Sequence, residues 1–463
     1  MTPASTFTLS LGTFLALAPW VSGAASPTLH SFNKLQLDGY YWSEGANFGD
    51  LNHDGKLDAI SGPYWWEGPQ FLRRHEFYPA KVTFHLKRAD GTTERLPGFE
   101  GALGKKNSYS QDNFFTFVYD FNNDGWNDVL TYGLPGTPAY VYLNPQGTER
   151  YWDRLTVFDA VDNESPTFMD VTGDGKPEII CNSVGTFGYA SPDWNNLNAK
   201  WPFVSISGKG PWGNFNHGLG IGDVNGDGRM DILERGGWWE HPSTTTTPAS
   251  QWVRRPAAFS PGGGAQMYTY DVNGDGRNDV ITSIAAHGYG LGWYEQLADK
   301  DADGNPQFKA HVFMNKEAGE NRYGVAFSQL HAVELVDMDG DGLKDIVTGK
   351  CFWAHGPTGD PDPGAPAVLY WFQLVRSDKG EIDWIPHLID GDAGVGRQIG
   401  VADVNSDGLP DLIIGNKKGT FVFVHQARMV TPEEWAKAQP AVKHAQAGDK
   451  QLKPEDVIQR TGK

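Results

Sequence analysis

Cysteine is scarce in this chain of 463 residues, which contains only Cys181 and Cys351. The two fall in different repeats of the pattern described below, so a disulfide between them is not expected and the fold must rely on its core. After the N-terminus, no apolar run is long enough for a membrane-spanning helix. Basic residues are few as well: 38 Lys and Arg face 57 Asp and Glu, giving a net charge of −19. Such an excess of acid argues against nucleic acid and anionic membranes as partners.

The two ends of the chain differ from the rest in composition. Residues 7–21 are apolar and almost uncharged, and Ser22, Gly23 and Ala24 form a small-residue cleavage site. We therefore predict a signal peptide over residues 1–24 and a secreted, periplasmic or cell-envelope location; a buried N-terminal segment is the alternative. Residues 428–463 form a polar C-terminal tail, for which a short helix and a disordered end are expected.

One nine-residue motif, D-x-[DNT]-x-D-G-x-x-[DE], occurs seven times. Its copies begin at Asp50, Asp120, Asp170, Asp223, Asp271, Asp337 and Asp403. The resulting period of about 50–70 residues is typical of propellers and other repeat arrays. The chain is also rich in glycine, with 57 residues, and tryptophan, with 17, which favours short strands, tight turns and aromatic packing over helices.

Each copy of the motif lies between two short runs of β-branched and aromatic residues, such as 267–270 and 279–282 around the fifth copy. These flanks have no helical period, so the motif is predicted to be a hairpin connection. A third, aromatic run usually follows, and a less regular fourth run precedes the next copy. We therefore predict an all-β fold, a seven-bladed β-propeller of four-stranded antiparallel blades, over residues 29–427. The last repeat has only three runs, and residues 29–37 are expected to supply its fourth strand and close the ring.

The side chains at positions 1, 3, 5 and 9 of the motif carry oxygen atoms that can converge on one cation. The glycine at position 6 permits the sharp turn, and hard oxygen ligands at this density favour Ca²⁺ over Zn²⁺ or Cu²⁺. Without a cation, three or four carboxylates would repel one another within each loop. Two alternatives are Asx-type turns without metal and an EF-hand, although an EF-hand requires flanking helices. The third copy, with Thr172 and Glu178, is expected to be the weakest site.

Up to seven Ca²⁺ ions are therefore predicted. Their expected ligands are Asp50, Asn52, Asp54 and Asp58; Asp120, Asn122, Asp124 and Asp128; Asp170, Thr172, Asp174 and Glu178; Asp223, Asn225, Asp227 and Asp231; Asp271, Asn273, Asp275 and Asp279; Asp337, Asp339, Asp341 and Asp345; and Asp403, Asn405, Asp407 and Asp411. With these loops the chain resembles the FG-GAP/VCBS repeat family, whose calcium-loop propellers include the head of integrin α chains. The resemblance implies the fold and the metal, and says little about activity.

A second cluster is predicted at the ends of the blades opposite the motif loops. The residues six positions before each motif are Glu44, Phe114, Glu164, His217, Ala265, His331 and Arg397. Six residues of strand span about 20 Å, roughly the depth of a blade, so these side chains are expected to share one channel mouth. Glu234 and Lys350, at the ends of second strands, and His287, on a connection between a second and a third strand, are expected there too. Solvated rim charges are the alternative interpretation.

The segments His217–Asp223, Ala286–Gly290, Thr348–Lys350 and Gly415–Gly419 resemble the propeller part of aldos-2-ulose dehydratases, which eliminate water from keto-sugars such as 1,5-anhydrofructose. Those enzymes have additional cupin domains, for which this chain has no room. The resemblance implies a carbon–oxygen lyase site at this mouth.

The residues that we expect to be catalytic are His217, His331, His287, Arg397, Lys350 and Glu234. Elimination needs a base and an acid, for which His217 and His331 are the candidates, and a cation such as Arg397 or Lys350 to stabilise the enolate oxygen. The alternatives are a non-catalytic propeller that binds a glycan or a cell-surface protein ligand, and a scaffold of the cell envelope.

Overall fold

The computed structural model describes residues 26–103, 108–243 and 252–445. The predicted signal peptide, residues 1–24, lies outside these residues, and so do residues 446–463 of the polar tail. Strands dominate, and the described residues contain one α-helix, α1 (Pro432–Ala438), and one short 3-10 helix, η2 (Ala318–Glu320). The short helix expected in the tail is thus confirmed; Thr431 caps it, accepting the backbone N–H of Glu434. Neither helix has the length and apolar character needed to cross a bilayer.

The described chain divides into two units. The small one consists of residues 26–29 and Ala427–Gln439, and in it Val430 N donates to Pro27 O at 2.9 Å. The large one consists of His30–Gln426 with residues 440–445 and contains all seven copies of the motif.

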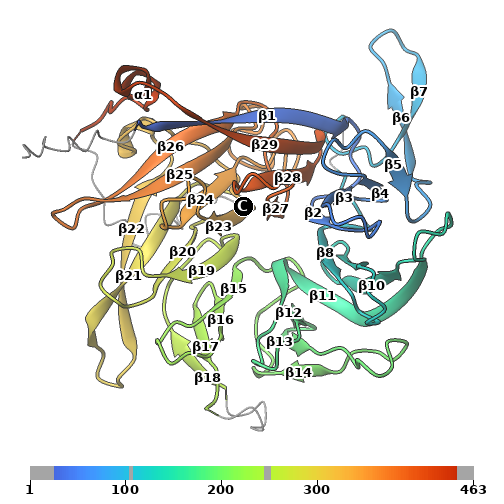
Figure 1. The fold of residues 1–463 in the computed structure, drawn as a ribbon. Helices are drawn as coiled ribbons and strands as arrows, with labels where there is room; N and C mark the ends of the chain where they lie inside the picture. The colour runs from blue at the N-terminus through green and yellow to red at the C-terminus, as the bar shows by residue number, and fades with distance from the viewer. Residues whose placement is uncertain (1–25, 104–107, 244–251, 446–463) are drawn as a thin grey trace, which may run out of the picture. The chain divides into compact units, whose positions relative to one another are not determined.

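The strands form six sheets (Figure 1). The first has the order β2 (Ala46–Gly49), β3 (Asp58–Ser61), β4 (Tyr64–Trp66) and β5 (Arg74–Glu76). A separate hairpin follows, made of β6 (Thr83–Lys87) and β7 (Thr93–Pro97). The seven-stranded sheet contains, in chain order, β8 (Phe115–Tyr119), β9 (Asp128–Tyr132), β10 (Thr137–Leu143), β11 (Asp153–Met169), β12 (Glu178–Ser183), β13 (Thr186–Ala190) and β14 (Phe203–Ser205).

The eight-stranded sheet joins two sets of four strands. It contains β15 (Leu219–Gly222), β16 (Asp231–Glu234), β17 (Gly237–Glu240) and β18 (Val253–Pro256), and then β19 (Gln266–Tyr270), β20 (Asp279–Ser283), β21 (Leu291–Lys300) and β22 (Pro306–Met314). The next sheet contains β23 (Val333–Val336), β24 (Asp345–Gly349), β25 (Leu369–Arg376) and β26 (Ile382–Asp390). The last has the order β1 (Thr28–Asp38), β29 (Gly419–Met429), β28 (Asp411–Asn416) and β27 (Ile399–Ala402).

The position of β1 confirms one expectation from the sequence. Residues near the N-terminus lie beside β29 and thereby complete a four-stranded sheet whose other strands come from the end of the chain. The long strand β11 was not foreseen: it pairs with β10 through its first part and with β12 through its last part, so one strand serves two successive repeats.

Every copy of the motif connects two antiparallel strands, as predicted. In each hairpin the residue just before position 1 pairs with position 9, for example Gly49 with Asp58 and Val336 with Asp345. Position 2 is apolar and buried in all seven copies, so it anchors the loop to the hydrophobic core. These residues are Leu51, Phe121, Val171, Val224, Val272, Met338 and Val404.

The strands that precede the motifs lie very close to one another. β15 pairs with β19 in parallel, and β2 contacts both β8 and β27. Glycine makes this approach possible: a Cβ on Gly220 would lie 1.9 Å from Met267 O, and one on Gly49 would lie 2.4 Å from a side-chain carbon of Val118. Neighbouring first strands can therefore pack backbone against backbone.

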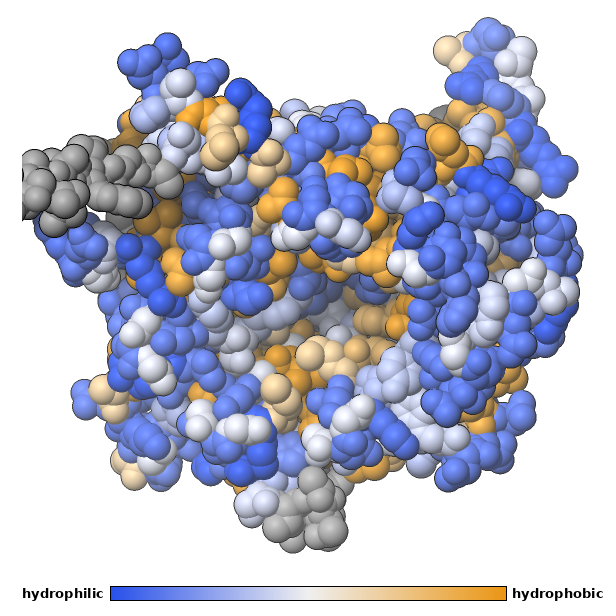
Figure 2. Space-filling model, viewed as in Figure 1, coloured by the Kyte–Doolittle hydropathy of each residue, from blue (hydrophilic) through white to orange (hydrophobic). Residues whose placement is uncertain are grey.

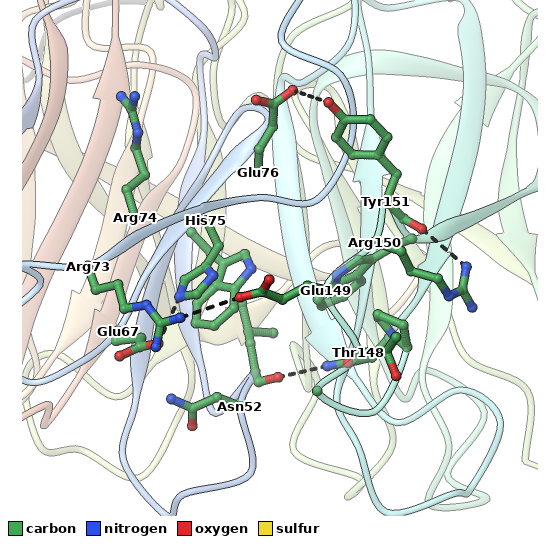
Figure 3. A pocket seen from close by; sticks show the side chains of 16 residues that line it. Asn52, Glu67, Arg73, Arg74, His75, Glu76, Thr148, Glu149, Arg150 and Tyr151 are labelled. Atoms are coloured by element: carbon green, nitrogen blue, oxygen red, sulfur yellow. Dashed lines mark hydrogen bonds and ion pairs between the residues drawn. The ribbon is translucent and has the colours of Figure 1, made fainter.

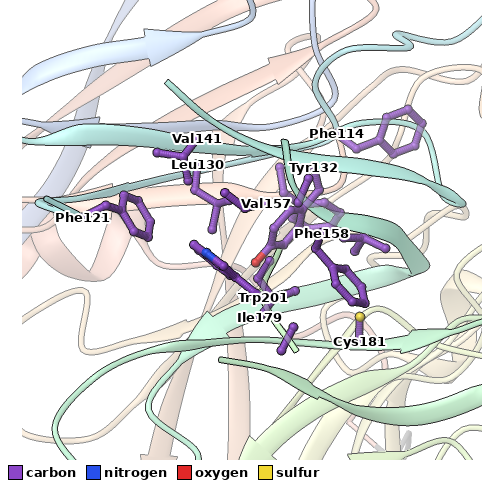
Figure 4. Packing of buried hydrophobic residues seen from close by; sticks show 14 residues of the cluster. Phe114, Phe121, Leu130, Tyr132, Val141, Val157, Phe158, Ile179, Cys181 and Trp201 are labelled. Atoms are coloured by element: carbon purple, nitrogen blue, oxygen red, sulfur yellow. The ribbon is translucent and has the colours of Figure 1, made fainter. Parts of the chain in front are cut away.

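The core is divided among several clusters between the sheets. The one drawn in Figure 4 is rich in aromatic residues and joins the two halves of the seven-stranded sheet, with Leu130 from β9, Val141 from β10 and Ile179 from β12 around the buried Trp201. Burial of so many large apolar side chains is the main favourable contribution to folding here. Cys181 and Cys351 are free thiols in two different clusters.

Candidate functional site

The acidic motif has the same local structure in all seven copies. The carboxylate at position 1 accepts the backbone N–H of the glycine at position 6, at 2.9 Å for Gly55 and Asp50 in the first copy. This bond closes the loop and directs the position 3 and position 5 side chains to the same side as position 1. Most of these side chains are at least partly exposed.

Position 9 is different because its carboxylate is buried in every copy. It accepts the backbone N–H of position 2, at 3.0 Å for Met338 and Asp345. In six copies its other oxygen accepts a backbone N–H at or just after the third strand, as Asp345 does from Leu374 at 2.8 Å. The residue thus ties three strands together. Burial, opposed by these hydrogen bonds and assisted by the nearby acids Asp339 and Asp341, raises the pKa of Asp345 to about 8.

The copies differ in how their charges are arranged. In the third and sixth, three carboxylate oxygens lie within 4.8 Å of one another; the sets are Asp170, Asp174 and Glu178, and Asp337, Asp339 and Asp345. The third copy was expected to be the weakest site, yet the longer side chain of Glu178 reaches the others. In the fourth and fifth copies an arginine at position 7 pairs with the position 5 aspartate, as Arg229 does with Asp227 and Arg277 with Asp275.

At the opposite ends of the first strands, Glu164, His217, His287 and His331 come together. We call these four residues the imidazole cluster. One donor atom from each lies within 4.8 Å of those of the others. His217 Nε2 is 2.9 Å from His287 Nε2 and 3.6 Å from Glu164 Oε1. The rings of His287 and His331 have centroids 4.4 Å apart.

Four separate segments position these side chains. Glu164 lies within β11, His217 and His331 precede β15 and β23 by two residues each, and His287 lies in the turn between β20 and β21. The turn is held by backbone hydrogen bonds, both within itself, as from Gly288 N to Ala285 O at 3.0 Å, and to the segment before β19, from Ala286 N to Gly263 O at 2.7 Å. The spacing from the motifs therefore predicted the positions of Glu164, His217 and His331. The connection between a second and a third strand predicted that of His287.

Arg397 lies beside the imidazole cluster and is fully enclosed by acids and a thiol. Its Nε donates to Glu164 Oε2 at 2.7 Å, and its Nη1 lies 3.8 Å from Glu44 Oε2 and donates to Cys351 Sγ at 3.0 Å. Tyr41 donates from its hydroxyl to the other oxygen of Glu44 at 2.5 Å. The guanidinium also lies over the ring of Phe114. Six of the seven residues that lie six positions before a motif, His331 among them, therefore share this region.

The charges of the cluster follow from burial and neighbours. Burial opposes a charge on Glu164, but His217, Arg397 and His287 outweigh it and lower the pKa of Glu164 to about 2. Burial lowers the pKa of His217 to about 4 and that of His331 well below its ordinary value. Both imidazoles are therefore neutral at pH 7, and the permanently charged Arg397 is left to hold the Glu164 carboxylate.

A second group of polar residues continues outward from His287. Asp360 Oδ1 lies 3.3 Å from His287 Nδ1 and 3.0 Å from His355 Nδ1, and the two imidazole rings stack at 4.3 Å. Burial opposes ionisation of Asp360, but hydrogen bonds from the two histidines lower its pKa well below the usual range. His355 is half exposed, so this group connects the buried cluster to solvent.

The remaining predicted residues lie around this centre at differing distances. The buried Lys350 has its pKa lowered by burial, partly offset by Cys351, Asp362 and Asp360, and its Nζ is 3.5 Å from Cys351 O. Glu234 is buried too, but its carboxylate pairs with Arg254 at 2.5 Å. No contact in the described residues joins Glu234 to the imidazole cluster.

Asp360 and His355 were missed by reasoning from sequence. They lie in a long connection between the second and third strands of the sixth repeat, which follows no repeated pattern. The same kind of connection in the fifth repeat carries His287, and that parallel is the signal that would have found them.

The large unit also contains at least two cavities. One, of about 380 Å³, receives side chains from all seven strands that precede a motif, with Phe117, Tyr268 and Glu334 among them. Figure 2 shows a hollow with apolar walls on the face drawn there. The other, of about 670 Å³, lies between β4, β5 and residues 144–152, where Arg73 pairs with both Glu67 and Glu149 (Figure 3).

Comparison with known families identifies the repeat. Residues 120–181, which span the second and third copies of the motif, match the FG-GAP-like repeat, and residues 395–424, which span the seventh, match the FG-GAP repeat. The chain contains FG-GAP repeats. The FG-GAP matches begin at position 1 of the second motif and eight residues before the seventh.

The solved structures that are similar to this chain are distant. An Agrocybe aegerita lectin that recognises non-reducing terminal N-acetylglucosamine has 15% identity over 72% of this chain and 90% of its own, with a TM-score of 0.40. BBS1N in complex with ARL6DN has 9% identity, coverage of 88% and 99%, and a TM-score of 0.44. The exotype rhamnogalacturonan lyase YesX has 12% identity, coverage of 86% and 72%, and a TM-score of 0.38. No curated protein sequence matches the chain.

Proposed function

We propose that the chain is a secreted, calcium-binding, seven-bladed β-propeller that catalyses elimination of water from a keto-sugar at the imidazole cluster. The observation that carries the proposal is the convergence of three imidazoles with Glu164 and Arg397 at the ends of the first strands. Mixtures of buried acids, bases and cations with shifted pKa values are typical of acid–base catalytic sites.

The propeller is supported by the sheet order. Each motif joins the first two strands of a four-stranded meander, with β11 shared by two meanders and β15 paired with β19 where two others meet. The seven first strands line one cavity, as the inner strands of propeller blades do. Secretion depends on residues 1–24 and remains a prediction.

Calcium is supported by the chemistry of the motif side chains. Each loop offers carboxylate and amide or hydroxyl oxygens and no nitrogen or sulfur donor, the set that Ca²⁺ prefers. The two loops in which three carboxylate oxygens lie within 4.8 Å fit an ion most directly. A bound Ca²⁺ would neutralise repulsion between these carboxylates and stabilise the hairpin.

The proposed reaction is an elimination next to a ketone. A base removes the proton on the carbon next to the carbonyl, the carbon–carbon double bond forms as the carbon–oxygen bond breaks, and an acid protonates the departing hydroxyl, which leaves as water. Atoms and electrons balance without an oxidant or a reductant. The product is an unsaturated ketone that absorbs in the ultraviolet.

His217 fits the role of base because its imidazole is neutral at pH 7 and its Nε2 faces the centre of the cluster. The sequence predicted His331 as the acid. Burial keeps its imidazole neutral at pH 7, so the imidazolium form that would donate the proton is not populated. We assign proton donation to His287 instead, since its Nδ1 faces Asp360, which also contacts the exposed His355. Protons can be replenished from solvent along this path.

The enolate oxygen needs a cation nearby. Arg397 is occupied by Glu164 and Cys351, so its charge acts on the cluster through Glu164. Lys350 makes one long contact, with Cys351 O, and is the remaining candidate to approach the oxygen.

The test is an ultraviolet assay of purified protein with keto-sugars such as 1,5-anhydrofructose. The wild type should form the unsaturated ketone, and His217→Ala should reduce kcat at least about 100-fold, as expected for loss of a general base. His75→Ala is the matched control, because His75 also pairs with a glutamate, Glu67, but lies on β5 away from the cluster. Equal rates for the wild type and His217→Ala would rule out the assignment.

A non-catalytic binding propeller is the second candidate, and the cavity of about 670 Å³ favours it because that cavity lies away from the imidazole cluster. Its rim carries the exposed Tyr151 together with Arg150 and Glu149, side chains able to stack on and hydrogen-bond to a glycan (Figure 3). This candidate predicts glycan retention without turnover. Tyr151→Ala should then abolish retention on a glycan array, and His217→Ala should not.

A further inference from the structure

The cavity of about 380 Å³ has a wall that repeats from strand to strand. The residue three positions before each motif lies on a first strand, and all seven of these residues line the cavity. We call them the inner ring. Two are glycines and five carry side chains into the wall; the members are Asn47, Phe117, Thr167, Gly220, Tyr268, Glu334 and Gly400.

The inner ring is separate from the imidazole cluster. Gln266 and Gln398 lie between them, five residues before their motifs, and their side chains reach from one first strand to another. Gln266 Nε2 donates to Arg397 O at 2.7 Å, and Gln398 Nε2 donates to Thr116 O at 2.9 Å. Met169, one residue before the third motif, also lines the cavity and is 45% exposed. The cavity therefore opens toward the motif loops and away from the histidines.

Glu334 carries the charge of this wall. Among the described residues that line the cavity there is no lysine, arginine or histidine and no second carboxylate. Glu334 Oε2 accepts the Tyr268 hydroxyl at 3.1 Å, but this hydroxyl has one proton and lies 3.1 Å from Val333 O as well. Burial, opposed by hydrogen bonds from Tyr268 and the Leu335 backbone, raises the pKa of Glu334 to about 7. The acid thus faces an apolar space without a counter-charge.

The rest of the wall suits a hydrocarbon group with a positive charge. The aromatic rings of Phe117 and Tyr268 belong to the inner ring, and the faces of such rings attract cations. The amides are already used by the protein, as in Asn47, whose Nδ2 donates to Thr116 O and whose Oδ1 accepts the backbone N–H of Phe48, both at 2.9 Å. Few polar groups are thereby left for the hydroxyls of a sugar.

We propose that the inner ring binds a small organic ammonium ion, an alkylamine or arylamine, with Glu334 as its counter-ion and Phe117 and Tyr268 beside it. A volume of about 380 Å³ lies within the range of cavities that hold small molecules. The net charge of −19 favours the approach of cations over that of anions. A neutral or anionic molecule of the same shape would leave the Glu334 carboxylate unpaired.

This inference does not rest on the proposed lyase activity, because the inner ring and the imidazole cluster share no residue. His217→Ala should lose turnover and bind the amine as the wild type does. Glu334→Gln should lose amine binding and keep turnover. Failure of one proposal can therefore be distinguished from failure of the other.

The experiment is isothermal titration calorimetry of the full chain with three probes of one shape: benzylamine, benzyl alcohol and benzoate. The buffer contains Ca²⁺ at pH 8, where most of the Glu334 carboxylate is ionised and benzylamine is still protonated. We expect one benzylammonium ion per chain, bound at least about 10-fold more tightly than benzyl alcohol, and no binding of benzoate. Equal affinity for the amine and the alcohol, or no binding of the amine, would overturn the proposal.

Glu334→Gln assigns the counter-ion. Glutamine has the same shape and still accepts the Tyr268 hydroxyl, so the variant should fold; it should bind benzylammonium at least about 10-fold more weakly and lose the preference over benzyl alcohol. Glu76→Gln is the matched control, because Glu76 also accepts a tyrosine hydroxyl at 3.1 Å, from Tyr151, but lies on β5 outside this cavity. Unchanged amine affinity in Glu334→Gln would exclude the site.

A second pair of variants tests the entrance and does not depend on the folding of Glu334→Gln. Met169→Lys adds a positive charge at the edge of the cavity, and Met169→Gln replaces the same exposed side chain without adding a charge. Repulsion between like charges should make benzylammonium binding about 2–5-fold weaker in Met169→Lys than in Met169→Gln. Equal affinities in the two variants would contradict binding in this cavity.

Discussion

Arg397 Nε donates to Glu164 Oε2 at 2.7 Å although the two residues are 233 positions apart in the sequence, and their side chains are 2% and 6% exposed. The pair joins the start of β27 to the middle of β11 across the ends of the first strands. A long-range ion pair buried to this degree is costly to desolvate, so it persists only because the surrounding groups satisfy both partners.

Arg397→Met tests this pair. The substitution keeps most of the side-chain volume and leaves Glu164 and Glu44 buried without their cation, so we expect it to lower the free energy of unfolding by about 3–5 kcal/mol. Urea denaturation at saturating Ca²⁺ would measure the loss. The control is Arg88→Met, which breaks the exposed pair with Glu94 and should cost less than about 1 kcal/mol. Equal losses in the two variants would show that the buried pair is dispensable.

The contact between Arg397 and Glu164 follows from a rule that was available in the sequence. Both residues lie six positions before a copy of the motif, as do Glu44, His217 and His331. The motif fixes the register of every first strand, because the residue just before its first position pairs with its ninth. Equal spacing therefore leads to equal height in neighbouring strands, and the side chains meet.

Other parts of the site had no such rule. Asp360 and His355 lie in a connection that varies in length among the repeats, so spacing from the motif gives no information about their height. Glu234 was predicted to lie at the channel mouth, but its carboxylate pairs with Arg254 of β18, a residue outside the repeated pattern. The fusion of two repeats through β11 was also missed, because residues 162–166, where the strand changes partners, are Asp, Asn, Glu, Ser and Pro, a composition typical of a turn.

Gly220→Ala tests the close packing of the first strands. An added Cβ would lie 1.9 Å from Met267 O, so β15 and β19 would have to separate. Overpacking of this kind typically costs about 1–3 kcal/mol, and a backbone contact leaves little room for relaxation. Gly208→Ala is the control, because its Cβ would meet nothing within 4 Å, and it should melt with the wild type. A Gly220→Ala variant as stable as Gly208→Ala would contradict the packing described above.

Removal of calcium should destabilise the protein if the loops bind it. We expect a chelator to lower the melting temperature by several degrees and Ca²⁺, but not Mg²⁺, to restore it, since an ion that binds only the folded state adds its binding free energy to stability. An unchanged melting temperature, with no calcium found by elemental analysis, would rule out the calcium proposal.

The individual loops should differ in affinity. The sixth has carboxylates at positions 1, 3, 5 and 9, whereas in the fourth Arg229 pairs with Asp227 and competes with a cation. Asp341→Asn should therefore remove one of the tightest sites in a calorimetric Ca²⁺ titration, and Asp227→Asn one of the weakest. The reverse order would show that charge count and the arginine pair do not control affinity.

Acid stability offers a test at a histidine outside the imidazole cluster. His387 on β26 stacks against Trp371 at 4.3 Å, and burial, assisted by His30, lowers its pKa to about 4. Because this value lies below the ordinary 6.5, the unfolded chain takes up the proton first as the pH falls. The folded state therefore loses stability between about pH 6.5 and pH 4, by at most about 3 kcal/mol for this residue.

Replacing His387 with glutamine removes the titrating group and keeps a polar side chain opposite Gln373, its hydrogen-bond partner at 3.3 Å. The difference in unfolding free energy between pH 7.5 and pH 4.5, measured by urea denaturation, should be smaller in His387→Gln than in the wild type. The exposed His85 provides the comparison, since His85→Gln should leave the difference unchanged. If His387→Gln and His85→Gln lose the same stability on acidification, the buried imidazole is already protonated in the folded state, and its stacking against Trp371 does not exclude the charge.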